Sequence, residues 1–454
     1  MGPRAAKQNG GLSRLGSWRN EKARRASSGL TRAGRPDRLP GGGTWFVCPK
    51  PMTGPSIFMR KVVLQNYMSI ARCTVAMRPL LFLVGPNGAG KSNFLDALRF
   101  VSDGLNTTVE HALRDRGGIG EVRRRSAGHP THFRIALDWG LPSGESGTYE
   151  FRVGAKPKGA FEVQEESCVV QSTNVLTPPV GFSVRSGRVE RCDVGSAPAA
   201  AADRLFLVAM SGHPVFRPLY DALVRMCFYN FNPDVVRELQ APDPGEVLAA
   251  DGSNLASVVK RLSEAGWKSR HDRVVELLGR VVPGLIGVDH KTLGKKETLQ
   301  FRQQMARSKE AWRFDAENMS DGTLRTLGVL VALFQPASSD GRTVRVVGIE
   351  EPETALHPGA AAVLRSALIE ASRHTQVLVT SHSPDLLDDK QIPPEALLVV
   401  ANREGETFLG PMDAASRSAV QDRLYTPGEL LRLNQIETDA TGAAVDATSE
   451  PSLL

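Results

Sequence analysis

The sequence predicts an α/β fold in which short buried strands end in polar segments. Three apolar runs indicate this fold, at residues 80–84, 344–349 and 377–379. The runs are short and rich in Val, Leu and Ile, which is typical of parallel strands that are buried on both faces. A glycine-rich segment follows the first run, acidic residues follow the second, and a histidine follows the third. The function is therefore sought in these three segments.

The segment after the first strand has the sequence of a phosphate-binding loop. It matches G-x-x-x-x-G-K-[ST] at every fixed position, with the residues Gly85, Pro86, Asn87, Gly88, Ala89, Gly90, Lys91 and Ser92, followed by Asn93. Apolar residues then recur at helical spacing, so the loop leads into a helix N-terminus, where free N–H groups favour an anion. Lys91 is expected to reach the β- and γ-phosphates of ATP, and the Ser92 hydroxyl to bind Mg²⁺. The alternative is a chance glycine-rich turn, which would lack the strand before the loop and the helix after it.

The second strand ends in the acidic segment Glu350-Glu351-Pro352-Glu353. Phosphoryl transfer depends on positioning and charge neutralisation, so a small set of carboxylates can suffice. We assign Glu350 to Mg²⁺ and Glu351 to the attacking water. An acidic surface turn is the alternative, and Glu353 is left open between a functional and a solvated role.

Two further segments complete the candidate site. His382 follows the third strand, where it can donate a hydrogen bond to the γ-phosphate or to the attacking water. Ser320 and Gly322 precede a run of apolar residues at helical spacing, and both suit a phosphate contact at a helix start. An ordinary helix N-cap at Ser320 is the alternative interpretation.

These segments resemble the ABC-type ATPases of the RecF, SMC and OLD (overcoming lysogenization defect) group, which are also grouped with the AAA-family ATPases. The resemblance covers roughly residues 56 to 437. Gly85 to Ser92 matches the Walker A motif, and residues 319–323 are similar to the signature of the OLD-like branch. Residues 350–358 resemble its Walker B motif and D-loop, and residues 381–384 its H-loop.

The resemblance implies a P-loop NTPase fold, specifically an ABC-type ATPase head with an antiparallel β subdomain and a mainly helical insertion. It also implies ATP and Mg²⁺ as cofactors and a homodimer that forms on ATP binding. In such a dimer the P-loop of one subunit faces the signature of the other, so Ser320 would act in trans. The sequence departs from the family at Glu350, where aspartate is usual, and at Met68, where many relatives carry a basic residue. No clear Q-loop glutamine is found.

The expected organisation has three parts. Residues 1–54 form a disordered Arg- and Gly-rich extension, residues 55–437 the ATPase domain with an insertion at about 200–310, and residues 438–454 a disordered tail. The net charge is +7, but residues 1–40 alone carry ten basic and two acidic side chains. The remaining residues sum to −1, so global charge does not support nucleic-acid binding by the ATPase body. The extension is interpreted as upstream sequence, with a transit peptide or a nucleic-acid-binding tail as alternatives.

Composition and length limit the remaining possibilities. Five scattered cysteines without a CxxC pair indicate free thiols in a reducing compartment, so a cytoplasmic protein is expected. No apolar run approaches the roughly 18 residues of a membrane span. Residues 132–195 alternate apolar and polar in places, which predicts the antiparallel sheet. Since 72 residues follow His382, we expect no Toprim nuclease domain of the kind that full OLD nucleases carry.

The function expected from these observations is an ATPase that dimerises on ATP and regulates a partner protein or acts on DNA, in DNA repair or phage defence. An ATP-dependent clamp or sensor with slow turnover is the first alternative. The nucleotide-binding subunit of a transporter is a weaker one, since the Q-loop is missing and the insertion is large.

Overall fold

The computed structural model describes residues 58–439, apart from Ala127, His129, Val175, Arg307 and Asp340. The predicted extension at 1–54 and all but the first two residues of the predicted tail lie outside the described residues. Within the described part of the chain, no helix combines the length and apolar character that crossing a membrane requires.

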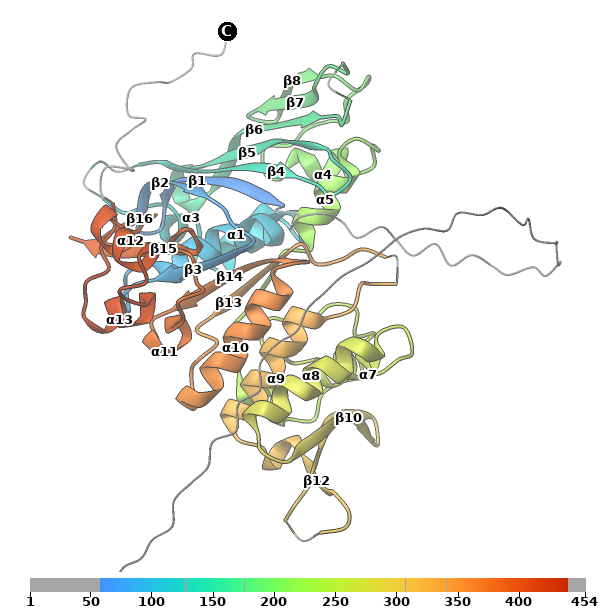
Figure 1. Ribbon diagram of the computed structural model, residues 1–454. Helices are drawn as coiled ribbons and strands as arrows, with labels where there is room; N and C mark the ends of the chain where they lie inside the picture. Colours follow the sequence, from blue (N-terminus) through green and yellow to red (C-terminus); the bar gives the residue numbers. More distant parts are fainter. Residues whose placement is uncertain are drawn as a thin grey trace, which may run out of the picture. The chain divides into compact units, whose positions relative to one another are not determined.

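A six-stranded sheet forms the centre of the fold (Figure 1). Its strand order is β16-β15-β3-β14-β13-β9, and all neighbours are parallel except the β15–β16 pair. The strands are β3 (Leu80–Val84), β9 (Cys227–Tyr229), β13 (Val346–Glu350), β14 (Gln376–Ser381), β15 (Leu397–Arg403) and β16 (Glu406–Pro411). The three predicted parallel strands are thus confirmed, and they are adjacent to one another as β3, β14 and β13.

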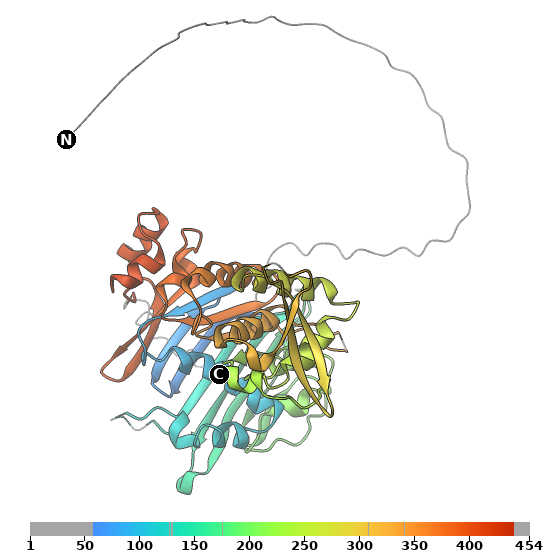
Figure 2. The same ribbon diagram turned by 90° about the horizontal axis from the view of Figure 1, so that it is seen from below.

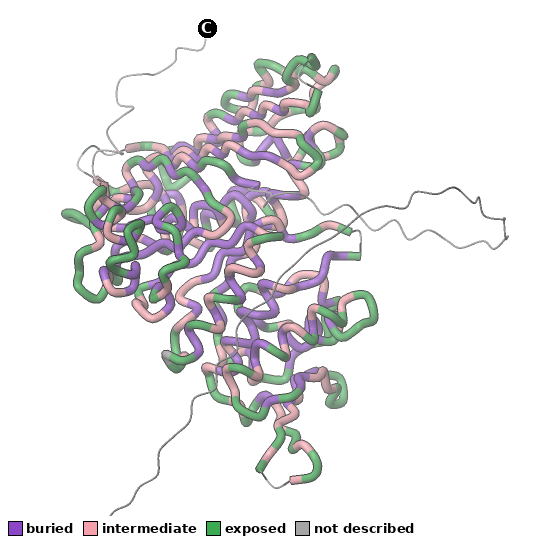
Figure 3. Tube along the Cα trace, in the orientation of Figure 1, coloured by how far each residue is buried: buried purple, intermediate pink, exposed green. Residues whose placement is uncertain are grey.

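Side chains of the central strand β3 divide between two hydrophobic cores. Leu81 and Leu83 belong to one core, and Phe82 and Val84 to the other, as the period-two geometry of a strand requires. All four are almost fully buried, and burial is concentrated along these strands in Figure 3. Both faces of the sheet are therefore covered, which explains the continuous apolar runs in the sequence.

A seven-stranded antiparallel sheet covers one face, with helix α1 (Lys91–Asn106) between the two sheets (Figures 1 and 2). Its order is β2-β1-β4-β5-β6-β7-β8. The strands are β1 (Met59–Tyr67), β2 (Ile70–Ala76), β4 (His132–Gly140), β5 (Ser146–Ala155), β6 (Phe161–Gln171), β7 (Val180–Arg185) and β8 (Arg188–Cys192). Its short helices are α2 (Val109–Arg114), α3 (Ile119–Val122) and the 3₁₀ turn Pro157–Gly159. This is the antiparallel subdomain that the sequence predicts.

A buried carboxylate fixes the chain where it leaves this sheet. Glu166 on β6 is 2% exposed and accepts hydrogen bonds from the Tyr149 hydroxyl (3.1 Å) and the backbone N–H groups of Leu207 (2.9 Å) and Phe206. Burial raises the pKa of Glu166 to about 7, although these donors favour its charged form. The contact ties the start of α4 (Phe206–Met210) to the sheet.

Helices cover the other face of the central sheet, and a small sheet packs on them (Figure 1). The helices of this half are α7 (Leu255–Leu262), α8 (Lys268–Val281), α9 (Asp321–Phe334) and α10 (Pro358–Ala371). The small sheet contains β10 (Leu285–Leu293), β11 (Lys296–Gln303) and β12 (Trp312–Asp315). The remaining elements are α5 (Arg217–Val224), α6 (Pro233–Arg237), α11 (Pro384–Leu387), α12 (Ala414–Gln421), α13 (Pro427–Arg432) and the 3₁₀ turns Ala316–Asn318 and Pro394–Ala396.

One strand lies where a mainly helical segment is expected. Strand β9 pairs in parallel with β13, so it is an edge strand of the central six-stranded sheet. The stretch from about 200 to 310 therefore contains a piece of the central sheet as well as helices and the small sheet. A three-residue strand is too short to show a period of its own.

Candidate nucleotide-binding site

The parallel register brings the predicted site segments to one edge of the sheet. Val84 pairs with Ser381 at the ends of β3 and β14, and Thr380 pairs with Glu350 at the ends of β14 and β13. The P-loop, His382 and Glu351 follow these three ends directly. Ligands of open parallel sheets bind outside the carboxyl ends of the strands, so the arrangement is that of a binding site.

The backbone of the P-loop needs glycine at two points. Gly90 has φ of 102°, and a Cβ there would collide with the Thr407 side chain. Gly85 has φ of 156°, and a Cβ there would overlap the carbonyl oxygen of Val400. The loop therefore approaches the neighbouring strands more closely than any side chain would allow.

Lys91 is folded back onto its own loop. The side chain is 5% exposed, and Nζ donates to the carbonyl oxygens of Gly85 (2.8 Å) and Pro86 (3.0 Å). Burial lowers the pKa of Lys91, while the nearby carboxylates of Glu351 and Glu353 raise it. A cation held among carbonyl dipoles beside the loop is in position to exchange them for phosphate oxygens.

A chain of hydroxyl groups fixes the loop from two distant segments. Thr407 Oγ1, on β16, donates to the carbonyl oxygen of Ala89 (2.9 Å) and lies 2.6 Å from Ser69 Oγ. The Asn93 amide donates to Ser69 Oγ (2.6 Å). Thr407 is almost fully buried. Neither Ser69 nor Thr407 is predicted by the sequence, since no local pattern connects residues more than 300 positions apart.

The two neighbouring glutamates occupy different surroundings. The Glu350 carboxylate lies 3.3 Å from Nη2 of Arg99 on α1. Glu351 has φ of 41°, a left-handed conformation that is uncommon for a residue with a side chain. Its backbone N–H donates to the carbonyl oxygen of Thr380 (3.0 Å) and lies 3.2 Å from the Thr380 hydroxyl. Such strain is concentrated at functional sites, where surrounding contacts maintain it.

Three side chains link the acidic segment to the histidine. Nδ1 of His382 lies 3.2 Å from Oε1 of Glu351. Glu353 accepts from the Ser381 hydroxyl (2.6 Å) and from the backbone N–H of His382 (3.3 Å). Burial raises the pKa of Glu353, against those hydrogen bonds. Glu353 thus contacts the backbone that carries His382, which is a positioning contact and not the solvated role considered as one alternative.

The signature segment lies at the start of α9. Ser320 is the N-cap of this helix, with Oγ accepting from the backbone N–H of Thr323 (3.3 Å), and it remains exposed. A Cβ on Gly322 would lie 2.6 Å from the carbonyl oxygen of Ala355, in the loop after the acidic segment. Ser320 is therefore a helix N-cap, as the alternative interpretation of this segment predicts. Within the described chain, no hydrogen bond or ion pair joins Ser320 or Gly322 to the P-loop, so the structure does not bring the signature onto its own P-loop.

The residues present fit a magnesium nucleotide. Ser92 is exposed at the start of α1, and Glu350 supplies a carboxylate at the end of β13. Mg²⁺ prefers such oxygen ligands and usually binds through one or two protein groups together with substrate phosphates. A Cβ at Gly88 would meet nothing within 4 Å, so the loop is open at this position.

Comparison with known proteins gives a family model and a curated relative. The model described as "AAA domain, putative AbiEii toxin, Type IV TA system" matches residues 80–167 and 286–388, which contain all four predicted motifs. Structural maintenance of chromosomes protein 1 of Schizosaccharomyces pombe is 32% identical over 124 residues, which are 24% of this chain and 10% of that protein. The match thus spans only a tenth of the relative's length.

Solved structures of SMC heads are also similar. One is an SmcHead bound to the C-winged helix domain of ScpA, with 12% identity, a TM-score of 0.48, and coverage of 80% of this chain and 99% of that one. A second is an Smc head domain with an extended coiled coil, bound to the C-terminal domain of ScpA derived from Pyrococcus furiosus. Its sequence identity is 11%, its TM-score is 0.49, and the match covers 81% of this chain and 99% of that one. A third is the SMC head domain from Thermotoga maritima, with 14% identity, a TM-score of 0.39, and coverage of 79% of this chain and 100% of that one.

The fold and the site define a P-loop ATPase head. The family model and the curated relative both support a similarity to ABC-type ATPases of the RecF/SMC group.

Proposed function

We propose that the chain binds and hydrolyses Mg²⁺–ATP and that ATP joins two copies into a dimer that regulates a partner protein or acts on DNA. The observation that carries this proposal is the meeting of the P-loop, Glu351 and His382 at the ends of three adjacent parallel strands. These groups belong to the set that positions phosphates and a nucleophilic water in phosphoryl transfer.

Each group has a proposed role. Lys91 and the backbone N–H groups of residues 87–93 bind the phosphates. Ser92 and Glu350 hold Mg²⁺, which neutralises phosphate charge when bound. Glu351 orients the attacking water, and His382, in contact with that carboxylate, donates to the water or the γ-phosphate. Glu353 keeps the His382 backbone in place through its contacts with Ser381 and His382.

The dimer is proposed from the position of the signature. Ser320 is exposed, and among the described residues neither it nor Gly322 contacts the P-loop of the same chain. A second copy would let the helix start at Ser320 approach the γ-phosphate from the opposite side, where N–H groups favour an anion. In the same arrangement the loop around Ala355, which packs on Gly322, would lie at the dimer interface.

The test is the oligomeric state of the Glu351→Gln protein with ATP, with ADP and without nucleotide, followed by light scattering. A doubling of mass with ATP alone supports the proposal. A monomer under all three conditions, in protein that binds ATP, would contradict it. Turnover of the unmodified protein then separates an active ATPase from the clamp or sensor alternative. Stimulation of that turnover by double-stranded DNA separates DNA from a protein partner as the target.

A further inference from the structure

An ion pair joins the helix after the P-loop to a proposed Mg²⁺ ligand. Nη2 of Arg99, on α1, lies 3.3 Å from Oε1 of Glu350, the last residue of β13. The two side chains are 31% and 18% exposed, and ion pairs that solvent reaches contribute little to stability. Among the described residues, the second carboxylate oxygen of Glu350, Oε2, makes no hydrogen bond. The pair therefore fixes one oxygen of Glu350 and leaves the other available.

Arg99 and Ser92 lie on the same face of α1. They are seven residues apart, which is two turns of the helix and about 10 Å along its axis. Helical side chains point toward the helix N-terminus, so the Arg99 side chain extends from its own turn toward the P-loop end. Through this contact, the helix that carries one proposed Mg²⁺ ligand, Ser92, also holds the other, Glu350.

The guanidinium of Arg99 packs on the edge strand β9. Its Cζ lies 5.9 Å from the centroid of the Phe228 ring, which is almost fully buried. Phe228 pairs with Gly348 on β13, and a Cβ at Gly348 would lie 2.3 Å from the ring, so the absence of a side chain makes room for it. Gly348 is two residues before Glu350 and is therefore on the same face of β13. The Phe228 ring thus supports the guanidinium beside the carboxylate.

One donor of this guanidinium has no partner. Nε of Arg99 is buried and makes no hydrogen bond within the described ranges of the chain. Buried polar groups are normally hydrogen-bonded, so an exception calls for an explanation. The position of Arg99 is not explained by hydrogen bonding of its own donors, whereas a role in orienting Glu350 explains it.

We propose that Arg99 is a positioning residue of the Mg²⁺ site, which holds Oε1 of Glu350 to α1 and leaves Oε2 to the ion. The inference rests on the proposed function, in which Ser92 and Glu350 hold Mg²⁺. Removing a group that orients a metal ligand lowers metal affinity by about ten- to a hundredfold. The positive charge of Arg99 opposes a bound cation, but both side chains are partly exposed, so solvent screens that repulsion.

The test compares how much Mg²⁺ strengthens ADP binding by the full chain and by its variants. ADP is chosen because it is not a substrate for hydrolysis and does not induce the proposed dimer. Calorimetry gives the affinity in EDTA and in excess Mg²⁺, and the ratio of the two affinities is the Mg²⁺ gain. Mg²⁺ binds free ADP equally in every sample, so a difference in gain between variants comes from the protein.

Arg99→Gln is expected to leave the affinity in EDTA unchanged and to lower the Mg²⁺ gain about tenfold, the low end of such effects. Arg99→Met keeps the packing on Phe228 and is a second neutral variant, for which the same loss is expected. Arg99→Lys keeps a positive charge near Glu350 and should retain more of the gain than either. Circular dichroism checks the fold of each variant.

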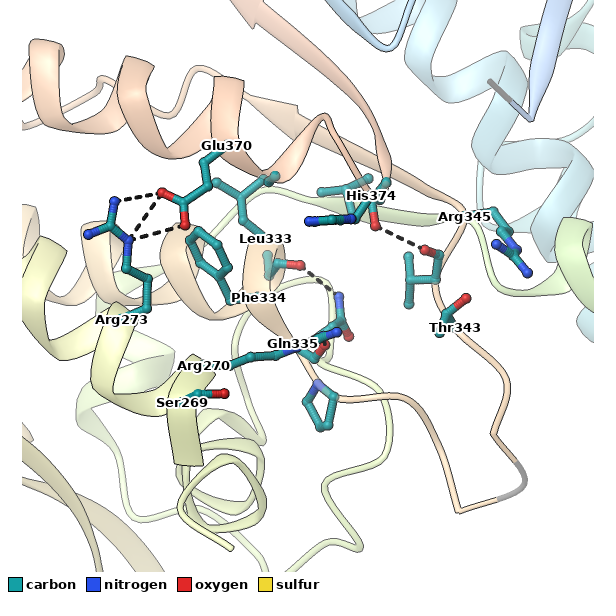
Figure 4. A pocket seen from close by; sticks show the side chains of 16 residues that line it. Ser269, Arg270, Arg273, Leu333, Phe334, Gln335, Thr343, Arg345, Glu370 and His374 are labelled. Carbon is teal, nitrogen blue, oxygen red and sulfur yellow. Dashed lines mark hydrogen bonds and ion pairs between the residues drawn. The ribbon is translucent and has the colours of Figure 1, made fainter. Parts of the chain in front are cut away.

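Arg273→Gln is the matched control for the loss of an ion pair. Arg273 is also 31% exposed, and it joins α8 to α10 through Glu370, at 2.6 Å. Figure 4 shows this pair beside a pocket of about 430 Å³, which residues 343–345 also line. These residues precede β13, so the pair lies toward the end of β13 opposite Glu350. Its loss should leave the Mg²⁺ gain unchanged.

A double variant separates this inference from the proposed function. If Arg99 acts through Glu350, Arg99→Gln should change the gain little in the Glu350→Gln protein, because the carboxylate that it positions is already gone. A lowered gain in Glu350→Gln, with an unchanged or raised gain in the neutral Arg99 variants, would overturn the inference and leave the proposed Mg²⁺ ligands in place. An unchanged gain in folded Glu350→Gln protein would overturn both.

Discussion

Nδ1 of His382 lies 3.2 Å from Oε1 of Glu351. This contact joins the ends of two adjacent parallel strands, β14 and β13, through the two side chains to which we assign catalysis. When Nδ1 carries the proton, it donates to the carboxylate and orients both groups. Glu351 has a left-handed backbone, which is held by the Thr380 carbonyl and hydroxyl on β14, the strand that precedes His382. The end of β14 therefore determines both the position and the orientation of the Glu351 and His382 side chains.

Lys91→Ala is expected to abolish ATP binding while the fold remains intact. The side chain supplies the main cationic contact to the phosphates, and loss of several charged hydrogen bonds should weaken affinity at least about a hundredfold. Calorimetry with ATP measures the affinity, and circular dichroism confirms folding. An unchanged affinity in folded protein would refute the P-loop assignment.

Glu351→Gln is expected to bind ATP, to hydrolyse it at least roughly a hundredfold more slowly, and to accumulate as the ATP-bound dimer. The substitution keeps the size of the side chain but removes the carboxylate that orients water. Glu350→Gln is the matched comparison and should instead raise the Mg²⁺ concentration that hydrolysis requires. If Glu350→Gln gives the trapped dimer and Glu351→Gln does not, the two roles are exchanged.

Ser320→Arg should leave ATP binding by each subunit intact and prevent both the ATP-induced dimer and most hydrolysis. A bulky cation at the exposed start of α9 would obstruct the proposed interface. Mixing this variant with Lys91→Ala tests the trans arrangement, since a mixed dimer contains one composite site of unmodified halves. Some activity should return on mixing. Hydrolysis at the parental rate by monomeric Ser320→Arg protein would exclude the trans mechanism.

Thr407→Val should weaken ATP binding while leaving the stability of the sheet nearly unchanged. The hydroxyl bonds the Ala89 carbonyl and Ser69, and its loss frees the P-loop from β16. Removing one partner of a buried hydrogen bond costs about 1–3 kcal/mol, so a decrease of roughly five- to a hundredfold is expected if the loop bears that cost. Thr407→Ser keeps the hydroxyl and is the control. Equal affinities for the two variants would show that the bond does not support the loop.

The buried carboxyl group of Glu166 should make the free energy of unfolding depend on pH. Its pKa is raised to about 7 in the folded protein, so the folded chain binds more protons than the unfolded chain between about pH 4.5 and 7. The contribution of Glu166 to stability therefore falls as pH rises through this window, by on the order of 3 kcal/mol.

The measurement is the free energy of unfolding by denaturant at pH 5 and pH 8. Glu166→Gln loses native hydrogen bonds at both values, but its difference from the unmodified protein should shift in its favour at pH 8. Glu165→Gln is the control, because Glu165 is the exposed neighbour on the same strand. A difference that does not vary with pH would contradict the raised pKa.

The sequence predicts the central strands and the four motifs well because each is encoded locally. A strand of five apolar residues followed by the P-loop pattern needs no information from elsewhere. By contrast, β9 is three residues long and becomes a strand only because β13 offers it an edge. The contacts of Thr407 with Ala89 and of Arg99 with Glu350 join segments that only the folded chain brings together. The role of Glu353 could not be decided in advance for the same reason.

The strand order has a consequence for the newly made protein on the ribosome. The strand before the P-loop is flanked by β14 and β15, which are synthesised about 300 residues later. At about 5–20 residues per second, this apolar strand waits roughly 15 to 60 seconds with both edges unpaired. Unpaired apolar edges promote aggregation, so the emerging chain should depend on chaperones until its last strands appear. The hydrogen bond from Thr407 that holds the P-loop at Ala89 also forms only after that interval.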